Sequence, residues 1–406
     1  MPPITVQKFG GKSVANAERV LSVARQIIKT YESGNSVVVV LSAQGNTTDR
    51  LLEKAREINK SANKRELDML LCTGEQQSVA IMAMAIHSLG YKAVSLNAVQ
   101  AGIAATNTHG NALIENINPT RIQTELKQGH IVLVAGFQGV NSNNDLTTLG
   151  RGASDTTAVA LTAVLNAKVC EIYSDVDGIY TVDPKLSPRA KKLSTIGYDE
   201  MLELAFSGVQ MLHGRAVEMA KRYKVPIVVR SSMAESTGTW IKENTKVEKL
   251  TVSGIAIDRN IARVSVIANQ PNAAYQIFSL LAKQQISVDI IMQSSTGSEI
   301  NFTVNRQDLA AAKDILEKTG IGKIETDETL AKLSVVGAGM ATNAGVASAI
   351  FEALFENDIN VRMVSTSEIK IAVLVDEQYV SRAATAIHDK FDDIFDSEAE
   401  EGEAKE

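Results

Sequence analysis

A lysine followed by two glycines ends the first apolar run of the chain. Lys8 is the only charged residue in that run, and Gly10 and Gly11 follow it closely. Glycines let backbone N–H groups approach an anion, and the N-terminus of a following helix adds positive potential. A mobile lysine beside such a loop would neutralise phosphate charge. Taken alone, Lys8 is explained more simply as a lysine that snorkels from an edge strand.

An arginine stands between two glycines in the segment Thr147–Thr157. A guanidinium held there would bind a carboxylate in bidentate fashion, so Arg151 is a candidate substrate clamp. Ser154 or Asp155 could cap the apolar helix expected over residues 158–165. Capping explains Ser154 and Asp155, but it does not explain an arginine between glycines.

A third segment, Ser174–Pro184, holds three acids and a tyrosine directly after another predicted buried strand. Such a loop suits a nucleotide or a metal–nucleotide complex. A simple turn built on Asp177-Gly178 accounts for the segment equally well.

Other chemistries lack their motifs. The five histidines form no metal-spaced pair, His213 is expected to be packed or to cap a helix, and no Gly-x-Ser-x-Gly occurs. Gly10-Gly11-Lys12-Ser13 resembles the end of a P-loop, but Val6 occupies the position of the required first glycine. A lysine with glycines, an arginine clamp and an acidic loop instead suit phosphoryl transfer, in which positioning and charge neutralisation dominate.

Short apolar runs alternate with helical patterns over the first 230 residues, which predicts a mainly parallel sheet covered on both faces. In such sheets, function collects at the carboxyl ends of the strands, where the three segments above lie. Helices are expected at Val20–Tyr31, Asp49–Ile58 and Leu67–Leu89. The predicted strands are Ile4–Phe9, Ser36–Leu41, Ala93–Leu96, Ile131–Ala135, Val169–Tyr173 and Pro226–Val229.

The composition is that of an ordinary globular protein large enough for two or three domains. Of 406 residues, 45% are hydrophobic and 22% charged, and 41 basic against 47 acidic side chains give a net charge of −6. Eight acids and one base fall in residues 392–406, so the rest of the chain is nearly neutral and shows no basic stripe for nucleic acid. Two cysteines, Cys72 and Cys170, exclude a disulfide framework. With no signal peptide and apolar runs too short to span a bilayer, we expect a cytoplasmic protein without nucleic-acid or membrane partners.

An internal repeat follows a polar segment at Ser231–Val247, which is expected to be a linker with at most one short strand. Ile277-Phe278 and Ile350-Phe351 are 73 residues apart, and other apolar positions match at the same offset. Each copy predicts strand, helix, strand, strand and helix, which is the size of a ferredoxin-like unit. A paired ligand-sensing module is favoured over structural padding.

Five ordered motifs resemble the aspartate kinase family across nearly the whole chain. They are Lys8-Phe9-Gly10-Gly11, Leu41-Ser42-Ala43 with Thr47-Thr48-Asp49, Thr73-Gly74-Glu75, Thr148–Thr157 and Tyr173–Pro184, and Ser365–Ile369 adds a further likeness. The resemblance implies an α/β, three-layer αβα amino-acid-kinase fold over residues 1–245, then two ferredoxin-like ACT regulatory domains at 253–325 and 331–391. The acidic tail, 392–406, is expected to be disordered.

The resemblance also implies roles for individual residues. Lys8 and Asp155 would be catalytic, with Asp155 orienting both the lysine and the substrate. Arg151 would bind the α-carboxylate of the amino acid and Glu75 its ammonium group. The substrate set is Thr48, Glu75, Arg151 and Ser154, and the ATP set is Lys8, Gly10, Gly11, Ser42, Ser174, Asp175, Tyr180 and Lys185.

The implied reaction transfers phosphate from ATP, with Mg²⁺ on its phosphates and no metal site on the protein, to the β-carboxylate of L-aspartate. This step opens lysine, threonine and methionine synthesis. Phosphorylation of glutamate and a non-catalytic amino-acid sensor are the alternatives. Gln210 stands where many members have a lysine, which leaves one ATP contact open. His213-Gly214 replaces the usual His-Pro.

Regulation is left open by the ACT effector loops, which read Asn269-Gln270-Pro271-Asn272 and Asn343-Ala344-Gly345 where Asp-x-Pro-Gly or His-Pro-Gly is usual. Gln293 is a candidate effector contact. The inhibitor, whether lysine, threonine, both or neither, is not specified. Pairing of ACT domains implies a homo-oligomer of undefined size.

Overall fold

The computed structural model describes residues 2–209, 211–243, 251–270, 272–295, 297–340, 343–392 and 395. These residues form two compact units. The first comprises the described parts of 1–179, 192–205 and 210–245, and the second those of 180–191, 206–209 and 246–406.

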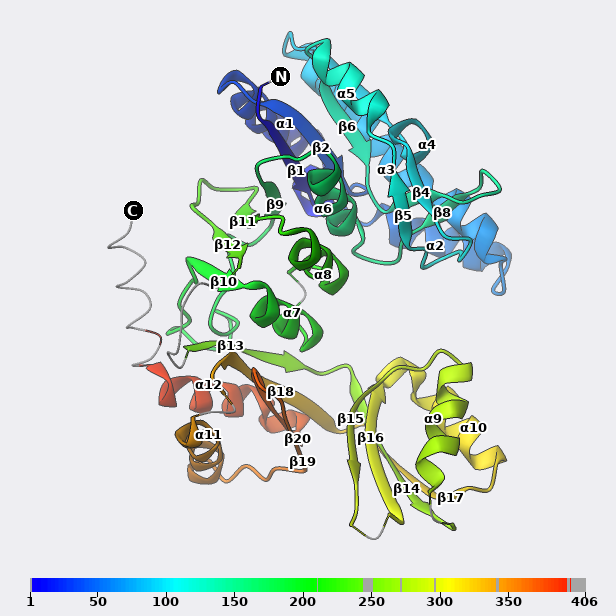
Figure 1. Cartoon of the computed structure of the whole chain (residues 1–406), viewed down its shortest axis with the longest axis vertical. Helices are drawn as coiled ribbons and strands as arrows, with labels where there is room; N and C mark the ends of the chain where they lie inside the picture. Colours follow the sequence, from blue (N-terminus) through cyan, green and yellow to red (C-terminus); the bar gives the residue numbers. More distant parts are fainter. Residues whose placement is uncertain are drawn as a thin grey trace. The chain divides into compact units, whose positions relative to one another are not determined.

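The elements of the first half of the chain alternate between strands and helices (Figure 1). In order they are β1 Ile4–Phe9, α1 Ala17–Glu32, β2 Ser36–Leu41, α2 Thr47–Ile58, α3 Lys64–Ser88, β3 Ala93–Leu96, α4 Ala98–Ala101, β4 Ile103–Ala105, β5 Ile114–Ile117, α5 Thr120–Lys127, β6 Ile131–Ala135, β7 Gln138–Val140, β8 Leu146–Thr148, α6 Ser154–Val164, β9 Cys170–Ser174, β10 Thr195–Gly197, α7 Tyr198–Phe206, α8 Gly214–Tyr223, β11 Ile227–Ser231 and β12 Thr239–Lys242.

The first unit is built on an eight-stranded sheet of order β10-β12-β11-β9-β1-β2-β6-β3, parallel except for the β11–β12 pair. All six strands predicted from the sequence belong to it, and the expected α/β class is confirmed. The strand β12 also joins this sheet, and it is the one short strand allowed for in the polar linker segment. Because β1 lies between β2 and β9, Lys8 does not stand on an edge strand, and that simpler explanation of it is wrong.

Successive residues of β1 serve opposite faces of the sheet. Phe9 packs with α1 and α3 in one apolar cluster, in which it stacks on Tyr173 with ring centroids 4.6 Å apart. Lys8 therefore points to the other face, where α6 packs against β1 and β2. A four-stranded sheet of order β5-β4-β7-β8 lies beside this core, and β8 leads into Gly150 and Arg151.

The helix α3 is long and apolar enough to cross a membrane by length and composition, but half of its most apolar window is buried inside the protein. It also carries two buried carboxyl groups, Asp68 and Glu75. A buried acid on the helix face turned inward is typical of a core helix that serves a site.

The second half of the chain forms two antiparallel sheets flanked by helices. Its elements are β13 Thr251–Asp258, β14 Ile261–Ala268, α9 Ala273–Lys283, β15 Val288–Gln293, β16 Glu299–Asn305, α10 Leu309–Lys318, β17 Gly322–Asp327, β18 Leu330–Ala338, α11 Ala344–Glu356, β19 Met363–Thr366, β20 Lys370–Asp376 and α12 Val380–Lys390. Short 3₁₀ turns lie at Arg306–Asp308 and Glu377–Tyr379 in this half and at Gly11–Val14 in the first half.

Each sheet has the strand and helix order expected from the sequence repeat, but the strand β13 is exchanged. The sheets have the orders β15-β16-β14-β17 and β13-β18-β20-β19. The strand β13 pairs with β18, with Ile255 opposite Val335, and so completes the second sheet. Residues 253–258, which the predicted bounds place in the first regulatory domain, therefore pair with the second sheet, and the bounds themselves stay a prediction. Sequence order alone assigned β13 to its neighbour in the chain.

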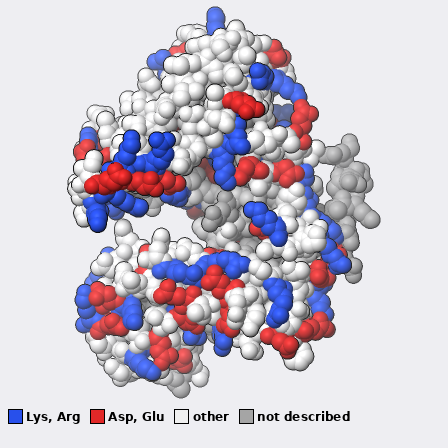
Figure 2. All heavy atoms as spheres, turned by 180° about the vertical axis from the view of Figure 1, so that it is seen from behind, with Lys and Arg blue, Asp and Glu red and all other residues white. Residues whose placement is uncertain are grey.

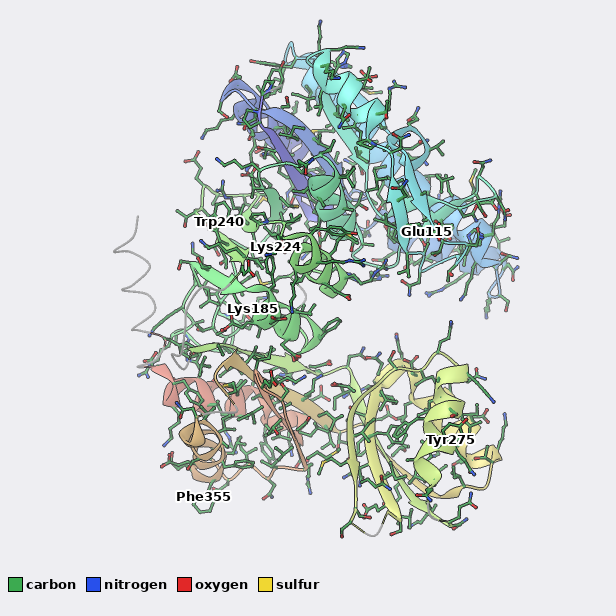
Figure 3. All side chains as sticks on the ribbon, in the orientation of Figure 1. Glu115, Lys185, Lys224, Trp240, Tyr275 and Phe355 are labelled. Atoms are coloured by element: carbon green, nitrogen blue, oxygen red, sulfur yellow. The ribbon has the colours of Figure 1, made fainter. Side chains whose placement is uncertain are left out.

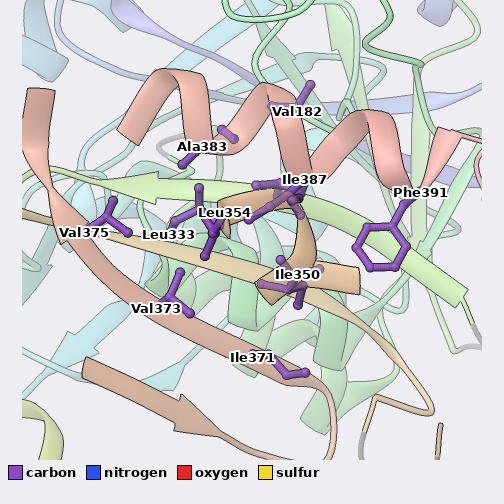
Figure 4. Packing of buried hydrophobic residues seen from close by; sticks show 14 of the residues in the cluster. Val182, Leu333, Ile350, Leu354, Ile371, Val373, Val375, Ala383, Ile387 and Phe391 are labelled. Carbon is purple, nitrogen blue, oxygen red and sulfur yellow. The ribbon is translucent and has the colours of Figure 1, made fainter. Parts of the chain in front are cut away.

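The segment Tyr180–Lys191 belongs to the second unit although it follows β9 in sequence. Val182 enters the apolar cluster formed by β18, β20, α11 and α12 (Figure 4). A backbone hydrogen bond from Ile255 N to Thr181 O (2.7 Å) fixes the segment there, together with a side-chain hydrogen bond between Thr181 Oγ1 and His388 Nε2 (2.9 Å). Lys185 lies on this segment (Figure 3).

Acidic and basic side chains are interspersed on the face shown in Figure 2. Large apolar side chains also reach the surface of the second unit, since Tyr275 on α9 and Phe355 on α11 are 81% and 83% exposed (Figure 3). Of the acidic tail, only Asp392 and Phe395 lie among the described residues, and Phe395 is buried. The predicted disorder of the tail otherwise falls outside the described residues.

Because β13 pairs with β18, a cavity made in β13 should destabilise the second of the two sheets rather than the first. Ile255→Ala removes a buried side chain from the second sheet's core and should cost about 2–5 kcal/mol. Amide hydrogen exchange should therefore quicken in β18 and β20. The matched variant Val264→Ala, in β14, should instead quicken exchange in β16 and β17. Faster exchange in β16 for Ile255→Ala would contradict the pairing.

Candidate active site

A buried ion pair lies at the centre of the first unit. Lys8 Nζ is 2.6 Å from Asp155 Oδ1, and the two side chains are 13% and 7% exposed. Asp155 lies in the first turn of α6, where the helix dipole favours a negative charge, and its Oδ2 accepts a hydrogen bond from His213 N (3.3 Å). The cap of α6 is Ala153, without a side-chain hydrogen bond, so the prediction that Ser154 or Asp155 caps the helix is wrong.

The glycines after β1 let the loop that follows β1 pack closely against the loop that follows β2. A Cβ on Gly11 would lie 2.4 Å from Ala43 O, so only glycine fits there. Gly45 N donates to Gly11 O (3.0 Å), and Ser42 N donates to Phe9 O (3.2 Å). A Cβ on Gly10 would lie 3.8 Å from Lys8 Nζ. Lys8, Gly10, Gly11 and Ser42, all predicted to contact ATP, therefore lie together at the ends of two adjacent parallel strands.

Glu75 faces the same loop from α3. Its Oε1 accepts a hydrogen bond from Ala43 N (3.1 Å), while its Oε2 is buried and makes no hydrogen bond within the described part of the chain. Burial raises the pKa of Glu75 to about 7, against the lowering effect of the bond from Ala43. Gly74 permits the approach, since a Cβ there would lie 2.9 Å from the Ala43 Cβ. The free carboxylate oxygen can accept an ammonium group.

Arg151 has a partner on the opposite side of the site. Its Nη2 lies 2.9 Å from Asp49 Oδ1, next to Thr48 in the first turn of α2, and its side chain is 78% exposed. An exposed ion pair of this kind is weak, so the guanidinium can exchange Asp49 for a substrate carboxylate. Ser154 is buried in the first turn of α6, and a Cβ on Gly136 would lie 2.6 Å from its Oγ.

The segment after β9 closes the other side of the glycine loop. Asp175 pairs with Lys12 (2.8 Å), which lowers the pKa of the Asp175 carboxyl, and accepts a hydrogen bond from Ser174 Oγ (3.1 Å). Ser232 Oγ donates to Ser174 O (2.9 Å) and lies 2.8 Å from Ser13 Oγ. Lys12, Ser13 and Ser232 were missed by the sequence analysis. Comparison with the P-loop pattern drew attention to Lys12 and Ser13 but rejected them for the lack of an upstream glycine.

Three predicted residues belong to the second unit. They are Tyr180, Lys185 and Gln293 at the end of β15, whose Nε2 donates to Gly297 O (3.4 Å). Gln210 lies outside the described residues. Their assignment to the nucleotide or effector sites stays a prediction.

Among the described residues, neither a protein-bound metal nor a reactive thiol is indicated. Within the described ranges, no group of three or more histidine, cysteine, aspartate or glutamate side chains could hold a metal ion. Cys72 and Cys170 are buried, and burial raises the pKa of both thiols, that of Cys170 to about 12. The available chemistry is a buried lysine and glycine-loop amides for phosphate, an exposed arginine for a carboxylate, and a buried carboxylate for a cation.

Comparison with known proteins also indicates a kinase domain followed by two ACT domains. Residues 3–231 match the amino acid kinase family, and residues 265–319 and 333–391 match the ACT domain. The aspartokinase of Geobacillus stearothermophilus is 48% identical over 96% of this chain and 97% of its own, and that of Corynebacterium glutamicum is 46% identical over 96% of each.

Two solved structures share the architecture. The structure of Escherichia coli aspartokinase III in complex with aspartate and ADP covers 95% of this chain and 99% of its own, with a TM-score of 0.83 at 24% identity. The Synechocystis aspartate kinase, 38% identical, has a TM-score of 0.56 over 96% of this chain and 69% of its own. A kinase-type sheet, an ACT-type repeat and full-length similarity above 45% identity agree: the chain belongs to the aspartokinase family.

Proposed function

We propose that this protein transfers the γ-phosphoryl group of ATP to the β-carboxylate of L-aspartate, giving 4-phospho-L-aspartate and ADP. The observation that carries the proposal is the buried Lys8–Asp155 pair beside the glycine loop, with the unpaired Glu75 oxygen nearby. The proposal is supported by the aspartokinase relatives and by the E. coli neighbour, whose structure holds aspartate and ADP.

Two charged side chains would orient the amino acid. The ammonium group binds the free Oε2 of Glu75, and the α-carboxylate replaces Asp49 on Arg151. Thr48 and Ser154 add hydroxyl groups from the first turns of α2 and α6. With both α-substituents held, the β-carboxylate is the remaining nucleophile. Glutamate places its carboxylate one methylene further away, so this arrangement favours aspartate.

The transfer itself requires no general base. The β-carboxylate is already ionised at neutral pH, so its oxygen forms a bond to the γ-phosphorus while the bond between that phosphorus and the bridging oxygen of ADP breaks. Negative charge on the transferred group must be offset, and Lys8 supplies a cation at the end of β1. Asp155 fixes the position of that cation, as the 2.6 Å ion pair requires. Gly10 and Gly11 let the phosphates approach the backbone.

ATP would extend from the glycine loop toward Ser174 and Asp175, with Tyr180 and Lys185 as further proposed contacts. Mg²⁺ would be held chiefly through the ATP phosphates, since the described residues offer no cluster of protein ligands, and its chemical contribution is neutralisation of phosphate charge. Removal of Mg²⁺ with EDTA should therefore abolish turnover.

The ACT domains would provide feedback control and assembly. A neighbouring structure at 23% identity is that of E. coli aspartokinase III with lysine and aspartate. We propose that lysine, threonine or both bind near Gln293 and the equivalent loop of the second domain, and that ACT domains of two chains associate. Titration with each amino acid, alone and combined, tests the first point, and light scattering tests the second.

One assay tests the reaction. Hydroxylamine traps an acyl phosphate as a hydroxamate, so the protein is incubated with ATP and aspartate, with glutamate, or with neither. Aspartate-dependent hydroxamate together with ADP is expected. Hydroxamate from glutamate alone would identify a different acceptor, and a complete lack of turnover would favour the amino-acid sensor.

Lys8→Ala should impair the chemical step, whereas Arg151→Ala should impair the binding of aspartate. Loss of the Lys8 charge removes stabilisation of the transition state and should lower kcat by about 10²- to 10³-fold with little change in KM. Loss of Arg151 removes a ground-state contact and should chiefly raise the KM for aspartate. Arg50→Ala, an exposed arginine of α2, is the matched control and should resemble the wild type. An unchanged aspartate KM for Arg151→Ala would refute the clamp.

The raised pKa of Glu75 predicts the pH dependence of substrate capture. Only ionised Glu75 attracts the ammonium group, so kcat/KM for aspartate should rise about tenfold per pH unit below about 7 and level off above it. Glu75→Gln has a side chain of similar shape that does not titrate, so its kcat/KM for aspartate should be low and independent of pH over that range. A wild-type step that persists in Glu75→Gln would assign the titration to another group.

A further inference from the structure

The first turn of α8 packs directly against the loop that carries Arg151. Gly152 has φ +82°, and a Cβ there would lie 2.9 Å from the ring of His213. Gly150 has φ +91°, and a Cβ would lie 2.7 Å from Asn111 Oδ1. Any side chain at either glycine would also be strained in this left-handed conformation. The loop is therefore shaped by what packs against it.

Arg215 is the residue of α8 that bonds to this loop. Its Nη1 donates to the carbonyl oxygen of Leu149 at 2.6 Å and to Asn111 Oδ1 at 3.3 Å. Its Nη2 donates to the carbonyl oxygen of Ala112 at 3.1 Å. Burial lowers the pKa of the Arg215 guanidinium, as expected for a cation taken out of water to serve backbone acceptors. One side chain thus joins α8 to two separate segments of the chain.

A buried carboxylate holds the same two segments from α3. Asp68 accepts hydrogen bonds from Thr148 Oγ1 at 2.6 Å and from Gly110 N at 2.9 Å, and its Oδ2 lies 2.9 Å from His109 Nδ1. In the strand that leads to Arg151, Asp68 bonds to Thr148. Arg215 bonds to the next residue along the chain, Leu149, whose carbonyl is the last one before Gly150.

We propose that Arg215 is a positioning residue for aspartate binding, a role that rests on the function proposed above. By fixing the Leu149 carbonyl, it restrains rotation of the peptide that leads into Gly150, a glycine in the left-handed region. Arg151 follows directly, so the direction of its side chain depends on that peptide. Arg215 itself binds backbone and Asn111, and it acts on the substrate only through Arg151.

An arginine is specifically suited to this role. Its planar guanidinium presents several N–H donors in fixed directions, so it satisfies the Leu149 and Ala112 carbonyls together. A lysine in its place offers a single ammonium centre and would hold one of the two segments less exactly. Arg215→Lys should therefore be intermediate between the wild type and Arg215→Met.

The test uses the full-length protein and the hydroxamate assay. Arg215→Met should raise the KM for aspartate at least tenfold while the KM for ATP stays within twofold of wild type. The matched control is Arg65→Met, because Arg65 anchors the other end of β8 through Asp145, with Nη2 2.9 Å from Asp145 Oδ1. Arg65→Met should lower the melting temperature but leave the aspartate KM within twofold.

Each outcome decides the proposal. An aspartate KM within twofold of wild type in Arg215→Met overturns it, as does an equal rise in Arg215→Met and Arg65→Met, which would indicate general loosening. If Arg215→Met is insoluble, Arg215→Lys is judged on whether its aspartate KM rises at least threefold. If the wild type shows no turnover with aspartate, the proposed function fails, and positioning is then judged by whether Arg215→Lys quickens amide exchange over residues 150–155.

Discussion

The ion pair between Lys8 and Asp155 determines how the rest of the first unit is built. Removing two charges from water costs several kcal/mol per ion unless good geometry and further hydrogen bonds compensate. Here compensation comes from the first turn of α6 and from the backbone N–H of His213. The pair joins a central strand to a helix N-terminus, and it keeps a cation fixed at the carboxyl ends of the parallel strands, where phosphate would bind. Stability is a weak reason to bury such a pair, whereas the positioning of a cation is a strong one.

Close backbone approach is the second constraint, and glycines at the loops permit it. Gly11 lies against the Ala43 carbonyl, and Gly74 brings α3 within reach of the same residue, so that Glu75 can accept its N–H. The cost is a buried carboxyl group with a raised pKa. That cost is explained if an ammonium group completes the site, because a bound cation restores the charged form. The same principle shapes Gly150 and Gly152 against α8.

Two segments complete the core of the second sheet although other parts of the fold are their neighbours in the sequence. The strand β13 completes the sheet of the second domain, although the first domain follows it in sequence. The segment Tyr180–Lys191 contributes Val182 to the same apolar cluster, while the residues before it continue from β9 of the first unit. The conformation of a segment expected to meet the nucleotide is therefore determined by the core of the regulatory domains.

The sequence by itself determined the strands of the central sheet, the class of fold, the repeat and most of the residues around the loop ends. Apolar periodicity and glycine position are local properties, and they predict local structure. Tertiary structure alone decided that Lys8 is central rather than at an edge, that neither Ser154 nor Asp155 caps α6, and that β13 joins the second sheet. It also brought Lys12, Ser232 and Arg215 to the site. These facts depend on the order of strands in the sheets and on contacts between residues far apart in the chain. Apolar periodicity in the sequence reports only local structure, so it does not encode either of them.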